Sequence, residues 1–342
     1  MKYVIINHNL LGDALFSEPA IASLRKSICS EDEIIMVVSS DQHNLVFENN
    51  PNFKLMVVTE DQMKAFKEKY TGGVRGLGTG QLVNYSATTK ACVLDVSAAF
   101  NWCYNHQTLK SFPVSNIKKP DGTRVMVDGA PRVLRVPQHF AFAFAHQLGV
   151  TIDNPHCKVY LTPEEIEDGK VYLSKRYKKP VILCGAVSKS CISRSTKPGE
   201  ENLPPNKMLT VNQWTPVIEA YKDRFDFVFL SGPDESLLDT TEGRYPENVT
   251  WQCGVNIRRV AAMCKAAVCI VGIDSGVGHL AAAVDANLIS IFAAVHSQLV
   301  DTSHTSGKFI VIDHSQGQLK NSLGISTVTS GEIIEAIEKM IG

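Results

Sequence analysis

Short apolar runs alternate along this 342-residue chain with stretches whose apolar positions have helical spacing. Such alternation is typical of α/β layers built on parallel sheets, because buried parallel strands read as nearly continuous apolar runs. For the first half, we predict strands over 3–7, 33–39, 54–59 and 91–96, with helices over 15–27 and 138–148. The charged segment 151–179, which ends before Pro180, is interpreted as a connection.

The same pattern restarts after this connection. We predict strands over 181–186, 225–232, 267–272 and 288–294, and helices over 210–223, 256–266, 278–286 and 330–341. Two successive halves of similar size predict an α/β fold with two Rossmann-like domains facing across a cleft, where ligands bind beyond the carboxyl ends of the strands. The expected boundaries are an N-terminal domain over 1–165, a C-terminal domain over 178–328 and a final helix over 329–342.

Composition narrows the functional classes. A formal net charge of −1 argues against a chain that binds nucleic acid through its overall charge. A basic cluster remains between Lys110 and Arg135, either as a solvated face or as a contact for an anionic acceptor. The nine cysteines show no CxxC spacing, and Cys184 and Cys269 lie in apolar runs, which indicates reduced thiols and no zinc site.

Targeting signals and glycine motifs exclude further classes. The chain contains no apolar span of membrane length and does not start with the pattern of a signal peptide, so we expect a cytoplasmic protein. The glycine-rich segment Gly72–Gly80 follows a charged stretch rather than a strand, which favours a flap over a dinucleotide fingerprint. The long polar loop Val187–Lys207 is typical of a functional or disordered segment. Without a GxxxxGK[ST] motif, P-loop phosphoryl transfer is disfavoured.

Two motifs carry candidate chemistry. In "NLLGDAL" a strand ends, a glycine permits a turn, and Asp13 stands near a helix start, either as an N-cap or as a general base for a hydroxyl. In "GIDSGVGHLAAA" a strand is followed by a helix of small residues. The helix start offers unpaired N–H groups to a phosphate, Gly276 and Gly278 let an anion approach the backbone, and Ser275 and His279 add donors. The alternative is a tight turn in which Asp274 caps the helix.

Lys207 is a third candidate. It stands just before the first helix of the second half, where it could neutralise a diphosphate or simply be solvated.

The pairing of "LLGDALFSEPAIASLRKSI" with "IVGIDSGVGHLAAAVDANLISIF" resembles the heptosyltransferase family, glycosyltransferase family nine. The family carries a GD motif after its first strand, followed by a proline and "LR", and a D-[ST]-G-x-x-H-x-A-A motif near the C-terminus. "YLTPEE" and "LSGPDE" agree more weakly. The resemblance implies a GT-B fold, with the acceptor on the N-terminal domain and a nucleotide-sugar on the C-terminal one.

The resemblance also implies the reaction. It is an inverting, metal-independent transfer of a sugar to an acceptor hydroxyl, most simply a heptose to a lipopolysaccharide core. The donor is an ADP- or UDP-linked sugar acting as co-substrate, and no cofactor is expected. By motif, Asp13 corresponds to the general base and Lys207 to the family's lysine, while the diphosphate loop comprises Asp274, Ser275, Gly276, Val277 and His279. We expect a monomer with no transmembrane segment and with peripheral contact at the inner face of the cytoplasmic membrane.

Departures from the family pattern leave the sugar and the acceptor open. The chain reads "INHN" where an arginine often precedes GD, "KMLT" in the K-x-W-P block, and "DSGVGH" where heptose enzymes commonly have "DTGLSH". Alternatives are therefore a phage-type glycosyltransferase that modifies a DNA base, using the basic cluster, and a non-catalytic protein that only binds a nucleotide-sugar. A Rossmann dehydrogenase is disfavoured, because no strand–GxGxxG–helix unit is present.

Overall fold

The computed structural model divides the chain into two compact units. The first comprises Met1–Asn9, Phe16–Ser39 and Asn52–Pro155, and the second comprises Leu10–Leu15, Ser40–Pro51 and His156–Gly342. Two short segments of the N-terminal half therefore pack with the C-terminal half. The structure describes residues 2–7, 11–38, 45–71, 82–86, 91–95, 108–111, 133–136, 139–185, 208–232, 246, 248–293, 297–300, 307–315 and 324–342.

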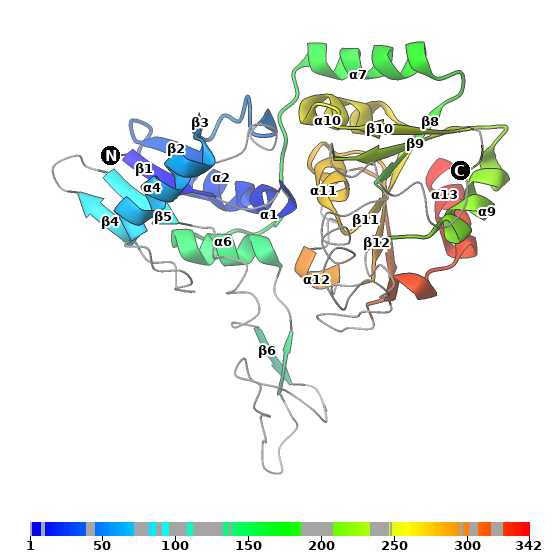
Figure 1. Ribbon diagram of the computed structural model, residues 1–342. Helices are drawn as coiled ribbons and strands as arrows, with labels where there is room; N and C mark the ends of the chain where they lie inside the picture. Colours follow the sequence, from blue (N-terminus) through cyan, green and yellow to red (C-terminus); the bar gives the residue numbers. More distant parts are fainter. Residues whose placement is uncertain are drawn as a thin grey trace. The chain divides into compact units, whose positions relative to one another are not determined.

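The first unit contains a five-stranded sheet in the order β3-β2-β1-β5-β4 (Figure 1). The central strand β1 pairs in parallel with both β2 and β5, so that Ile5 lies between Met36 and Leu94, and only β4 runs antiparallel. The strands are β1 (Lys2–Ile6), β2 (Glu33–Val38), β3 (Lys54–Val57), β4 (Leu82–Ser86) and β5 (Ala91–Asp95).

The helices of the first unit are α2 (Glu18–Ser27), α4 (Glu60–Thr71) and α6 (Phe140–Leu148), of which α2 packs against α6. Phe16, just before α2, contacts the rings of His139 and Phe140 edge-on at centroid distances of 5.1 and 5.9 Å. A separate antiparallel pair is formed by β6 (Thr108–Ser111) and β7 (Val133–Val136).

The second unit contains a six-stranded, wholly parallel sheet in the order β10-β9-β8-β11-β12-β13. The chain builds outward from β8 to β10, then returns to the other side of β8 and continues through β11 to β13. The carboxyl ends of β8 and β11 therefore form the topological switch point, where such sheets bind ligands. The strands are β8 (Val181–Gly185), β9 (Asp226–Ser231), β10 (Val249–Cys253), β11 (Cys269–Ile273), β12 (Leu288–Phe292) and β13 (Phe309–Asp313).

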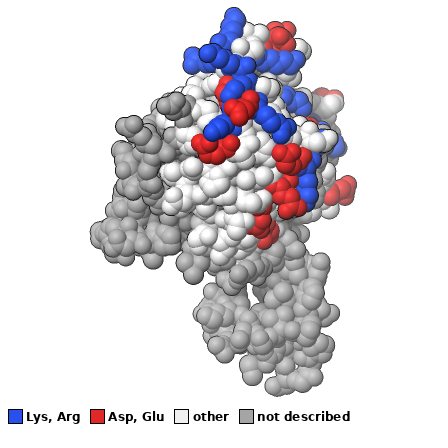
Figure 2. Space-filling view, turned by 90° about the vertical axis from the view of Figure 1, so that its right-hand side faces the viewer, with Lys and Arg blue, Asp and Glu red and all other residues white. Residues whose placement is uncertain are grey.

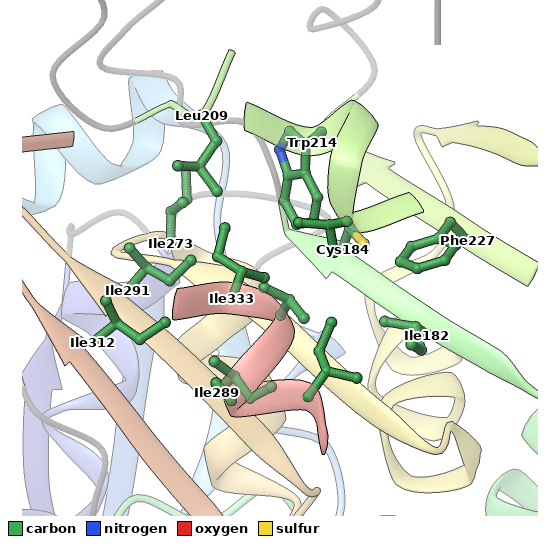
Figure 3. Close-up of a cluster of buried hydrophobic side chains, with 14 of the residues drawn as sticks. Ile182, Cys184, Leu209, Trp214, Phe227, Ile273, Ile289, Ile291, Ile312 and Ile333 are labelled. Carbon is green, nitrogen blue, oxygen red and sulfur yellow. The ribbon is translucent and has the colours of Figure 1, made fainter. Parts of the chain in front are cut away.

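Helices cover both faces of this second sheet (Figure 1). On one face, α9 (Val211–Tyr221) and α13 (Ser330–Ile341) close a core to which alternate strand residues contribute, among them Ile182, Cys184 and Ile289 (Figure 3). On the other face lie α10 (Ile257–Ala266) and α11 (Gly276–Ala283), with α7 (Pro163–Arg176) packed on α10. The remaining elements are α1 (Leu11–Leu15), α12 (Ser297–Val300) and a 3-10 turn (Gly324–Thr327).

Every predicted strand and helix is present within a few residues of its expected position. The segment 151–179 is the clearest miss, because it contains the 14-residue helix α7. A sequence signal for this helix exists in "TPEE", where Thr162 and Glu165 form a capping box and Pro163 occupies the first helical position.

The sequence predicted buried, reduced thiols, and Cys184 and Cys269 are buried and free. Burial raises the pKa of the Cys264 and Cys269 thiols to about 12, as expected of reduced cysteines inside a core. On the face seen in Figure 2, Lys and Arg side chains gather at the top and mix with Asp and Glu side chains lower down, beside a broad uncharged area. Among the described residues, no helix is both long and apolar enough to cross a lipid bilayer.

Candidate functional site

The loop between β11 and α11 lies at the switch point of the second sheet. A Cβ added to Gly185, the last residue of β8, would lie 3.1 Å from Val277, so the end of β8 meets the start of α11. Gly272 and Gly278 let the helix approach its strand, because a Cβ on Gly272 would lie 3.2 Å from the Gly278 Cα. Small residues are thus required here for packing.

Ser275 is the N-cap residue of α11, and Asp274 is not. The Ser275 side chain makes no capping hydrogen bond, and among the described residues its buried Oγ has no hydrogen-bond partner. The first intrahelical bond runs from His279 N to Ser275 O at 3.2 Å, so the N–H groups of residues 276–278 have no acceptor within the helix. Ser275, Gly276 and Val277 are partly exposed, so an anion can approach the amides at this helix start, and the buried Ser275 hydroxyl lies beside them.

Asp274 and His279 form a buried pair behind this helix start. The Asp274 Oδ1 and His279 Nε2 atoms lie 3.4 Å apart, and the two residues are 8% and 7% exposed. The backbone N–H of Asp274 donates to Ile291 O of β12 at 3.2 Å, which fixes the loop to the sheet. The pair is therefore better placed to hold the loop in shape than to face solvent.

Asp13 lies on α1, and α1 packs against α11 within the second unit. Asp13 is the third residue of the helix and partly exposed, so it is not the N-cap that the alternative interpretation required. Its neighbours make the contact: a Cβ on Gly276 would lie 3.1 Å from Leu11 Cδ2, and a Cβ on Gly12 would lie 2.7 Å from His279 Cδ2. The two sequence motifs, more than 250 residues apart, thus meet.

Sequence reasoning gave no separate role to Gly12. The only sequence signal for this contact is that a glycine directly precedes the candidate base. That glycine was interpreted as permitting a turn, and not as making room for a histidine ring.

Several predicted features lie outside the described residues. Lys207 is one of them, as are the segments Gly72–Gly80 and 187–206. Of the basic cluster, only the backbone of Lys110 in β6 and Arg135 in β7 is described. Within the described ranges, no group of three or more His, Cys, Asp or Glu residues is arranged to hold a metal ion. Metal independence itself stays a prediction.

Comparisons with known proteins identify a family domain in the second half of the chain. Residues 197–321 match the family model Glycosyltransferase family 9 (heptosyltransferase), a range that contains the β11–α11 loop and Lys207 but not Asp13. No curated protein sequence matches the chain.

Solved structures match over the whole chain. A family 9 glycosyltransferase from Veillonella parvula DSM 2008 is 17% identical with a TM-score of 0.62, covering 99% of this chain and 97% of that one. E. coli ADP-heptose LPS heptosyltransferase II is 10% identical with a TM-score of 0.62, covering 100% and 98%. E. coli heptosyltransferase WaaC with ADP is 16% identical with a TM-score of 0.57, covering 99% and 100%.

At these identities the structural matches establish the fold, and the family model identifies the catalytic class. The predicted α/β architecture of two Rossmann-like domains is confirmed. The protein is a glycosyltransferase of the GT-B fold that carries a glycosyltransferase family 9 (heptosyltransferase) domain over residues 197–321.

Proposed function

We propose that this protein transfers a heptose from an ADP-linked donor to a hydroxyl of a lipopolysaccharide core, with inversion and without a metal ion. The observation that carries the proposal is the meeting of α1, which holds Asp13, with the start of α11 inside the second unit. One element offers a carboxylate and the other offers donors for a phosphate. Two of the similar structures are ADP-heptose LPS heptosyltransferase II and heptosyltransferase WaaC with ADP, which supports the choice of nucleotide.

The leaving group is a nucleoside diphosphate that gains negative charge as the bond to the anomeric carbon breaks. In the proposed mechanism the amides of residues 276–278 and the Ser275 hydroxyl stabilise this charge where it develops, with Lys207 as a further cation. These donors are fixed by the helix before the donor arrives. They could therefore act without a divalent ion.

The acceptor hydroxyl needs a base because its own pKa is high. Asp13 takes the hydroxyl proton as the oxygen bonds to the anomeric carbon, and the diphosphate departs from the opposite side of that carbon with its electron pair. The configuration at carbon is then inverted in one step. Asp274 is assigned to ordering the loop, since its carboxylate is buried against His279.

The test is a thermal-shift screen against ADP, UDP and GDP, followed by turnover of the matching nucleotide-heptose with and without EDTA. A nucleotide at 100 times its Kd should stabilise the folded protein by about 2.7 kcal/mol. We expect ADP to stabilise the protein more than UDP or GDP and ADP release from ADP-heptose to survive EDTA. Absence of a shift with every nucleotide would contradict donor binding, and loss of turnover in EDTA would contradict metal independence.

The remaining parts of the proposal concern location and assembly. The proposed protein is a monomer, and an acceptor carried on a lipid would bring it to the inner face of the cytoplasmic membrane. Sedimentation measurements at micromolar concentration test the monomer, and co-sedimentation with anionic vesicles tests the membrane contact.

A further inference from the structure

The His279 ring occupies the space beside Gly12 where any side chain would begin. A Cβ built on Gly12 would lie 2.7 Å from His279 Cδ2 and 3.4 Å from Nε2, closer than side chains tolerate. Gly12 has ordinary helical backbone angles, which any amino acid can adopt. Only the lack of room beside the ring therefore excludes a side chain at this position. The contact is therefore specific to this glycine and this ring.

The ring is also held at Nε2, the atom next to Cδ2. His279 Nε2 lies 3.4 Å from Asp274 Oδ1, with both side chains 8% exposed. The backbone of each residue is fixed in turn, since Asp274 N donates to Ile291 O and His279 N donates to Ser275 O, both at 3.2 Å. The sheet and the helix thus determine where the ring lies, and the ring determines how closely α1 can approach.

Two contacts align α1 with α11. Leu11 lies against Gly276, and Gly12 lies against His279. Gly276 and His279 are three residues apart and so lie on one face of α11, one turn from the other. The segment that leads into Asp13 therefore follows the face of the helix whose N-terminal amides are assigned to the diphosphate.

We propose that His279 is a positioning residue that fixes the Gly12–Asp13 segment against the donor loop. Its ring, held by Asp274, places the proposed base relative to the helix start that binds the donor. The inference rests on the proposed function and deepens it. It gives His279 a task different from the phosphate contact suggested by the sequence motif, because the ring is buried in contact with Gly12 and Asp274.

A double-mutant cycle tests the proposal with Gly12→Ala, His279→Ala and the double variant. In Gly12→Ala the new methyl group collides with the ring and displaces Asp13, and a displacement of about 1 Å can lower kcat about 100-fold. We expect ADP affinity to stay within about threefold, since the α11 amides are untouched. In the double variant the ring is gone, so kcat should exceed that of Gly12→Ala by about 10-fold.

Gly331→Ala is the matched control. Gly331 is also the second residue of a helix, and a Cβ there would lie 3.9 Å from the nearest atom outside its own chain neighbours, an ordinary contact. Its turnover should equal that of the wild type.

The outcomes distinguish the positioning role of His279 from the proposed function of the protein. If the effects of the single changes on kcat multiply in the double variant, the positioning role is wrong. If His279→Ala loses ADP affinity while kcat at saturating donor is kept, His279 is a donor ligand instead. A wild-type protein that neither binds ADP nor turns over ADP-heptose would overturn the proposed function. The same cycle measured in urea unfolding would then decide whether the ring excludes a side chain at Gly12.

Discussion

The guanidinium of Arg258 and the carboxylate of Glu165 form a bidentate ion pair inside the second unit. Arg258 Nη2 donates to Glu165 Oε2 at 2.6 Å, and Nε donates to Oε1. The remaining donors bond to the carbonyl oxygens of Leu45 (3.0 Å), Glu48 (3.2 Å) and Tyr160 (2.7 Å). All five N–H groups of this 6%-exposed side chain are thus satisfied, and they join three parts of the chain.

Arg258→Met is expected to lower the free energy of unfolding by about 3 kcal/mol, because removing one member of a buried pair leaves its partners unsatisfied. Urea denaturation measures the loss. Arg259→Met is the matched control, since Arg259 is exposed on the same helix. Its guanidinium lies over the Tyr172 ring, with Cζ 5.2 Å from the ring centroid. The control should lose less than about 1 kcal/mol. Equal losses in the two variants would contradict the role of Arg258.

Glu165 makes this part of the stability depend on pH. The hydrogen bond from Arg258 is the main cause that holds the pKa of the Glu165 carboxyl below its ordinary value of 4.5. Because the folded-state pKa is the lower one, the contribution is fully present above pH 4.5 and disappears as the pH falls through the folded-state value. Glu165→Gln should therefore be less stable than the wild type at about pH 7, with the difference shrinking below about pH 4.

Glutamine at this position can keep the capping box with Thr162, so the variant isolates the charge. A difference between wild type and variant that grows on acidification would reverse the sign and refute the assignment.

Asp13→Asn should abolish sugar transfer while ADP binding persists. An amide cannot accept the acceptor proton, and loss of a general base lowers kcat by about 100- to 10,000-fold. Turnover of the nucleotide-sugar and the thermal shift with ADP are measured on the same samples. Asp61→Asn, at an exposed acid in the first turn of α4, serves as the control and should keep full activity. Retained turnover in Asp13→Asn would show that Asp13 is not the general base.

Ser275→Ala separates a ligand contact from a structural cap. The Ser275 Oγ makes no capping bond, so its loss should change the free energy of unfolding by less than about 0.5 kcal/mol. The loss of a hydrogen bond to a charged phosphate should weaken ADP binding about 10-fold. Thr329→Ala provides the opposite case, because Thr329 caps α13 in a capping box. It should cost about 1 kcal/mol of stability and leave ADP binding unchanged.

Much of the fold could be predicted from periodicity because the strands of parallel sheets are buried on both faces and stand out as apolar runs. The strand over 269–273 and the helix over 330–341 are examples. Helix α7 was harder to find because its apolar positions are few and charges dominate it. Its capping box was the stronger signal.

The sequence motifs pointed to candidate residues that the structure brings together, but only partly to their geometry. Asp274 and His279 belong to one motif, yet local sequence gives no sign that they pair in a buried position or that the ring meets Gly12. Such contacts arise from the crossing of α1 with α11, two helices brought together by tertiary packing. Lys207 remains a prediction because it lies outside the described residues.

Because Leu10–Leu15 and Ser40–Pro51 belong to the second unit, they affect how chimeras of this enzyme and its relatives must be built. A chimera joined once, near Pro155, would pair the C-terminal half with foreign versions of both segments. It would then replace two of the three carbonyl acceptors of Arg258 and the glycine that accommodates His279. Exchange of donor specificity between related enzymes must therefore carry three pieces of chain together, since the functional module is discontinuous in sequence.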